Sequence, residues 1–60
     1  MSYVTLRPNS STNPTKQHQV VDYDDWMRYV NGESQAYKVA DSFAKYSDAQ
    51  AYCEKLNNPA

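Results

Sequence analysis

The sequence has little of the residue types from which most catalytic and metal sites are built. Its 60 residues include one glycine, one cysteine and one histidine. A single glycine almost excludes a glycine-rich loop that cradles phosphate, and one cysteine can form no internal disulfide. A lone Cys53 and a lone His18 also supply no metal-ligand cluster. We therefore expect no metal, no cofactor and no enzymatic activity.

Long hydrophobic runs are missing as well. No stretch is long enough to span a membrane, and none has the apolar core of a signal peptide. A single cysteine fits a reducing compartment. We therefore expect a soluble, cytoplasmic protein with no membrane partner.

Strong net charge is also absent. The net charge is −1, and residues 22–60 carry seven acids against four bases, a net of −3. A dedicated nucleic-acid binder has a basic footprint, which this chain lacks. We therefore do not expect nucleic acid to be its main partner.

The chain length allows one small domain over residues 1–60. A chain of this size buries only about 60% of its unfolded surface, so its stability margin is thin. No disulfide or metal staple compensates. A homodimer, or docking on another protein, would be one way to gain stability.

The clearest helix signal lies at the C-terminus, over residues 47–57. Four side chains at i, i+3, i+4 and i+7 form one apolar stripe: Ala49, Tyr52, Cys53 and Leu56. Ser47 and Gln50 have the spacing of a capping box. Asn57, Asn58 and Pro59 predict the end of the helix. This amphipathic helix must dock its stripe on the rest of the domain.

Residues 23–31 permit two interpretations. Asn31 and Gly32 are a common turn of a β-hairpin, which would make residues 26–30 a strand. However, neither face of that strand would be cleanly apolar. A short helix with Asp22 or Asp24 as its cap and Gly32 just beyond its end fits better. Its apolar stripe consists of Tyr23, Trp26, Met27 and Val30.

The remaining segments predict about three short antiparallel strands. Residues 3–7 alternate apolar and polar side chains, and residues 17–22 centre on two valines. Between them, residues 8–16 form a polar loop that we expect to be flexible. Residues 34–43 fit either a strand or a helix, and we predict a strand with a turn at Asp41 and Ser42. The fold class is therefore α+β.

The acidic cluster and the aromatic residues are the features most typical of binding. Asp22, Asp24 and Asp25 could form a patch for a basic partner, although acids at a helix start are also common for dipole reasons. The chain has six tyrosines, one tryptophan and one phenylalanine but no isoleucine. A domain this small cannot bury every ring, so we expect some to act as exposed anchors. Tyr29 and Tyr46 are the candidates, because Tyr29 lies off the apolar stripe of its helix and Tyr46 lies just before the predicted C-terminal helix.

These observations predict a non-enzymatic protein-binding module. Its partner-binding residues would be Asp22, Asp24, Asp25, Tyr29 and Tyr46. In general appearance the chain resembles small accessory proteins of phages or mobile elements, some of which inhibit a host enzyme or defence complex by occlusion. It would then act in the host cytoplasm.

Two alternatives remain open. A nucleic-acid-binding module would combine tyrosines with five basic side chains: Arg7, Lys16, Arg28, Lys38 and Lys45. A structural subunit would instead cover its apolar faces in a homo-oligomer.

Overall fold

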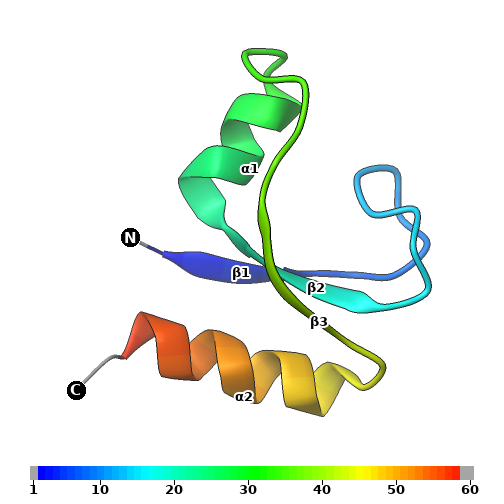
Figure 1. Ribbon diagram of the computed structural model, residues 1–60, viewed down its shortest axis with the longest axis vertical. Coiled ribbons are helices and arrows are strands. Elements are labelled where there is room, and N and C mark those ends of the chain that lie inside the picture. Colours follow the sequence, from blue (N-terminus) through cyan, green and yellow to red (C-terminus); the bar gives the residue numbers. More distant parts are fainter. Residues whose placement is uncertain (1, 59–60) are drawn as a thin grey trace.

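The computed structural model describes residues 2–58, which form three strands and two helices (Figure 1). In chain order these are β1 (Tyr3–Leu6), β2 (His18–Asp22), α1 (Tyr23–Val30), β3 (Val39–Phe43) and α2 (Tyr46–Asn57). The strands pair antiparallel in the order β1-β2-β3. The predicted α+β class, with a short helix and a C-terminal helix, is confirmed.

The register of β1 and β2 sorts their side chains between the two faces of the sheet. Thr5 pairs with Val20 and Leu6 pairs with Gln19, and successive residues of a strand point to opposite faces. Val20 packs against α2, so we call the face of Thr5 and Val20 the α2 face. The opposite face carries Leu6, Gln19 and Val21. Helix α1 lies on that side of the sheet, away from α2 (Figure 1).

The main hydrophobic core cluster lies between the α2 face and α2, while Leu6 and Val21 are buried on the opposite face. In the main cluster, Val20 and Ala49 are fully buried, and Cys53 is only 9% exposed. Four partly buried side chains surround them: Tyr3, Phe43, Tyr52 and Leu56. The apolar stripe predicted for the C-terminal helix is therefore the surface that docks on the sheet.

The predicted capping box at the start of α2 is wrong. The helix begins at Tyr46, its N-cap is Lys45, and no side chain caps it. Ser47 is already inside the helix, so its hydroxyl is not placed as a cap is. At the other end, Asn58 is the C-cap with φ −128°, outside the left-handed region, and its N–H donates to the Glu54 carbonyl at 2.9 Å. Pro59 lies outside the described residues.

Both ends of α1 follow the helical interpretation of the sequence. The Asp22 side chain caps the helix, accepting the N–H groups of Asp24 at 3.0 Å and Asp25 at 3.2 Å. Gly32 follows the C-cap with φ +81°. Its N–H donates to the Tyr29 carbonyl, and the next N–H, of Glu33, donates to the Arg28 carbonyl. These two bonds form a Schellman motif, not a hairpin turn.

Gly32→Ala is expected to lower the free energy of unfolding by about 1 kcal/mol, since a side chain disfavours positive φ. No atom lies within 4 Å of the position a Cβ would take, so the cost is conformational and not steric. Thermal unfolding should show a loss of about 4–8 °C for a domain of this size. Gln35→Ala, at an exposed site in the next turn of chain, is the control. An unchanged melting temperature for Gly32→Ala would contradict the predicted strain.

The third strand is shorter than expected, and the turn predicted at Asp41 and Ser42 is wrong. In β3, Asp41 lies opposite Val20 and Ser42 lies opposite Gln19. Both stay extended because they pair with the central strand, and the Asp41 carboxylate accepts the Ser42 N–H at 2.8 Å. Residues 34–38 are irregular, and the chain bends at residues 44–45 instead.

The polar loop between β1 and β2 is built around one fully buried side chain, Asn13. Its Nδ2 donates to the carbonyls of Arg7 at 3.0 Å and Gln17 at 2.8 Å, and lies 3.4 Å from that of Leu6. Its Oδ1 accepts the Thr15 hydroxyl at 2.6 Å. The flexibility of residues 8–16 stays a prediction, and Asn13 is the anchor that any movement of the loop has to release.

Side chains occupy backbone groups along both outer strands of the sheet. The Asn57 amide meets β1 at two points, accepting the Tyr3 N–H at 2.7 Å and donating to the Tyr3 carbonyl at 3.0 Å. On the other side, Asp41 takes the Ser42 N–H. Just before β3, Asp25 takes the Lys38 N–H at 2.7 Å. These contacts reduce the backbone groups on which another chain could add a strand.

Candidate functional site

Four of the five predicted partner-binding residues line two hollows, and the fifth, Tyr29, lines neither and packs on Tyr37. Asp22, Asp24 and Asp25 line one hollow of about 320 Å³ together with Arg28 and Lys38, which we call the acidic hollow. Tyr46 lines a second hollow of about 470 Å³, the Tyr46 hollow, with Thr5, Arg7 and His18. His18 and Asp22 are the two ends of β2, which are about 13 Å apart for a strand of this length. The two groups therefore form separate sites.

The three carboxylates of the acidic hollow have different roles. Asp22 caps α1, and Asp25 fixes the chain before β3 through the Lys38 N–H. Asp24 is exposed, and its carboxylate accepts no hydrogen bond from residues 2–58. It is therefore the carboxylate that a partner could engage without loosening the fold.

Two cations share this hollow with the carboxylates. Arg28 is expected there, because it follows Asp24 and Asp25 by four and three residues on one helix. Lys38 could not be placed from the sequence, since its position depends on the backbone contact with Asp25. The hollow thus carries mixed charge with an excess of one negative, and is less acidic than the sequence cluster alone indicates.

The apolar stripe of α1 is only partly covered. Tyr23 and Val30 are 40% and 47% exposed, Trp26 and Met27 are half-buried, and no residue of α1 is fully buried. The rings of Tyr23 and Trp26 are 6.2 Å apart. Trp26 Nε1 is shielded from solvent and has no hydrogen-bond partner among residues 2–58. We call these four residues the α1 stripe.

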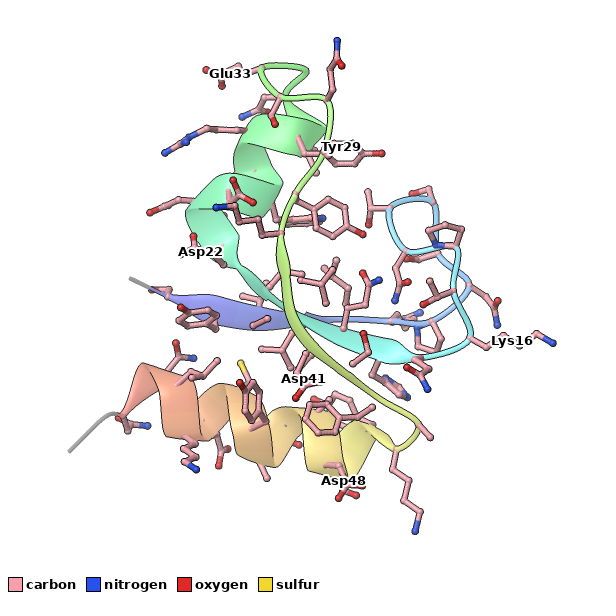
Figure 2. All side chains as sticks on the ribbon, viewed as in Figure 1. Lys16, Asp22, Tyr29, Glu33, Asp41 and Asp48 are labelled. Atoms are coloured by element: carbon pink, nitrogen blue, oxygen red, sulfur yellow. The ribbon has the colours of Figure 1, made fainter. Side chains whose placement is uncertain are left out.

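The two aromatic candidates differ in exposure. Tyr29 is half-buried because Tyr37 packs edge to face on its ring at 5.0 Å. Figure 2 shows Tyr29 on α1, projecting toward the side of the chain that leads to β3. Tyr46 is 52% exposed, and the centre of its ring lies 5.6 Å from that of the His18 ring. Their roles in partner binding stay predictions.

Tyr37 joins the segment before β3 to the rest of the opposite face. Its hydroxyl donates to the Thr12 carbonyl and lies 2.9 Å from Oε1 of Gln19. Burial, with a smaller contribution from Tyr29, raises the pKa of the Tyr37 hydroxyl. It therefore stays protonated at neutral pH and can keep donating. Nothing in the local sequence around Tyr37 indicated this role.

Cys53 has the surroundings of a structural cysteine. Burial raises the pKa of its thiol, Glu54 adds to this effect, and a hydrogen bond from Asn57 opposes it. The thiol Sγ donates to the Tyr3 carbonyl at 3.2 Å. Since the thiolate is the nucleophile, a protonated and buried thiol is inert.

Within residues 2–58, no three His, Cys, Asp or Glu side chains are grouped as a metal ion would require. In the same part of the chain, neither helix has the length and apolar character that crossing a membrane would require. No protein-family model, curated protein or solved structure matches the chain significantly. The fold defines a small α+β domain, and the two hollows and the α1 stripe are the surfaces on it that could bind another molecule.

Proposed function

We propose that this protein is a non-enzymatic protein-binding module that docks through α1. The observation that carries the proposal is the incomplete burial of the α1 stripe. Its two outer members, Tyr23 and Val30, remain 40% and 47% exposed in a domain that has few large apolar side chains to spare. Exposed aromatic and aliphatic side chains on one helix face are typical anchors for a groove on another protein.

The charges beside the stripe define the chemistry of the partner. Asp24 is exposed in the first turn of α1, next in sequence to Tyr23, where it can meet an arginine or lysine at the rim of the interface. The preferred partner surface is therefore an apolar groove bordered by basic residues. Occlusion of that groove is the simplest way for so small a module to inhibit its target. We propose that this happens in the cytoplasm, where a reduced Cys53 is stable.

The arrangement of the basic side chains favours a protein partner over nucleic acid. Arg28 and Lys38 lie among three carboxylates, whereas Arg7 lies in the Tyr46 hollow. A strand of nucleic acid needs a continuous positive track, and the acidic hollow interrupts one. A homo-oligomer remains the competing explanation of the exposed α1 stripe.

Val30→Ser is expected to weaken partner binding about tenfold, since an exposed apolar anchor contributes about 1–2 kcal/mol at an interface. The tagged protein would be used to capture the partner from lysate, and the purified pair would then be titrated calorimetrically. Asp24→Asn should weaken binding less and flatten its dependence on salt. Neither Asp22 nor Asp25 is suitable for this test, because both hold backbone N–H groups.

Asp48→Asn is the matched control for Asp24→Asn. Asp48 also lies in the first turn of a helix, but on α2, where Figure 2 shows it on the side away from the sheet. It should leave binding unchanged. Equal loss of binding for Asp48→Asn and Asp24→Asn would refute docking through α1. Self-association that Val30→Ser abolishes, without any partner, would assign the stripe to a homo-oligomer instead.

A further inference from the structure

The Tyr46 hollow gathers hydrogen-bond donors from two strand ends and a helix start. Thr5 lies on the α2 face of β1, and Arg7 follows it two residues later. His18 precedes Val20 by two residues on β2, so the register brings it to the same face. Helix α2 begins only at Tyr46, and the hollow lies where this helix begins. Its position at the end of the sheet therefore follows from the fold.

The surroundings of this hollow favour a negatively charged ligand. Residues 1–21 contain Arg7, Lys16 and His18 but no acid. Helix α2 adds the positive end of its dipole, and its N-cap Lys45 makes no side-chain cap. Asp48, the acid of that first turn, lies on the side of α2 away from the sheet (Figure 2). Among residues 2–58, no carboxylate lines the hollow itself, and the exposed Asp41, which shares this face of the sheet, lies on β3 opposite Val20 and outside the lining.

The size of the Tyr46 hollow and the exposed ring of Tyr46 at its rim indicate a ligand that is larger than a simple anion. The hollow, of about 470 Å³, is half open to solvent and has room for a phosphate and one further group beside it. Tyr46 is 52% exposed and only tilted against His18, at 55° between the ring planes. Part of its ring is thus open to a planar group, and base–aromatic stacking is favourable for every base. An arginine matches the paired oxygens of a phosphate.

We propose that the Tyr46 hollow binds a nucleoside monophosphate. Arg7 and the Thr5 hydroxyl hold the phosphate, His18 borders it, and the base lies against Tyr46. This site is separate from the α1 stripe, so the test of nucleotide binding does not depend on whether the proposed protein partner exists. Binding a nucleoside monophosphate also needs no continuous basic track, because the ligand carries only one phosphate group.

The proposal is tested by titrating the isotope-labelled full chain by NMR with adenosine monophosphate, inorganic phosphate, adenosine and a short single-stranded oligonucleotide. Adenosine monophosphate should shift the amide signals of Thr5, Arg7, His18 and Tyr46, and bind about tenfold more tightly than inorganic phosphate because of stacking. Adenosine alone should bind more weakly than its monophosphate. Tighter binding per nucleotide by the oligonucleotide would overturn the proposal in favour of strand binding.

Two charge-removing variants separate the site from general electrostatics. Arg7→Gln should weaken binding of the monophosphate about tenfold, as expected for loss of a charge-assisted hydrogen bond. Lys16→Gln removes the same charge from a side chain that extends into solvent (Figure 2), and should have little effect. Both positions are exposed, so circular dichroism should show the native fold. Equal weakening by the two variants, or no shift at the four lining residues, would overturn the proposal.

Discussion

Asn13→Ala should lower the free energy of unfolding by about 3 kcal/mol, because it leaves several backbone groups without partners. The Asn13 side chain is fully buried and serves the carbonyls of Arg7 and Gln17 together with the N–H and hydroxyl of Thr15. Alanine can replace none of these bonds. A domain of this size rarely has more than about 3–5 kcal/mol in total. The variant should therefore keep no more than about 2 kcal/mol, which denaturant unfolding would show as a much lower midpoint.

Ser11→Ala is the control for this result. Ser11 lies in the same loop but is exposed, so its substitution should change stability by no more than about 0.5 kcal/mol. Asn13→Asp keeps the oxygen acceptor but removes the donating Nδ2, so it should lose nearly as much stability as Asn13→Ala. A loss for Asn13→Ala as small as that for Ser11→Ala would mean that the loop is not held by its amide.

Val20→Ala should cost about 2–3 kcal/mol, the second largest expected loss. Val20 is fully buried where the sheet meets Ala49 and Cys53, so deleting its methyl groups leaves a cavity in the centre of the only core cluster of residues 2–58. The surrounding side chains come from both the sheet and α2 and cannot collapse freely. The loss is measurable as a lower denaturant midpoint with an unchanged slope.

Val30→Ala provides the same chemical change at an exposed position. Val30 is 47% exposed on α1, so its truncation should alter stability by about 0.5 kcal/mol or less. If the proposed function is right, the same variant should nevertheless weaken partner binding. Equal destabilisation by Val20→Ala and Val30→Ala would contradict the position of the core between the sheet and α2.

The elements that were predicted correctly from the sequence are those that depend on local signals. Helix α1 has Asp22 at its start and Gly32 just past its end, and both act as their residue types do in most helices. The apolar stripe of α2 was likewise visible from spacing alone. The start of α2 was predicted wrongly. Ser47 is a residue type that often caps helices, but the chain is already helical at Tyr46.

Contacts between distant segments account for the features that sequence reasoning missed. In the sequence, Asn13 does not differ from other loop asparagines. Its role appears only in the folded chain, where its amide donates to the carbonyls of Arg7 and Gln17. The predicted turn at Asp41 and Ser42 failed because pairing with β2 decides the conformation there. In the candidate site, Lys38 joined the carboxylates through a contact spanning 13 residues.

The side-chain contacts at the edges of the sheet have a consequence for how this protein could bind a partner. With Asn57 on β1, and Asp25 and Asp41 on the other side, part of the backbone is already engaged, which leaves fewer groups on which a partner could add a strand. Tyr23, Val30 and Asp24 are exposed on α1, whereas Trp26 and Met27 are half-buried. If α1 docks as proposed, substitutions at the three exposed positions would alter recognition while the fold persists. Under the proposed function, folding and partner choice would then depend largely on different residues, and surface substitution alone would be enough to change the target.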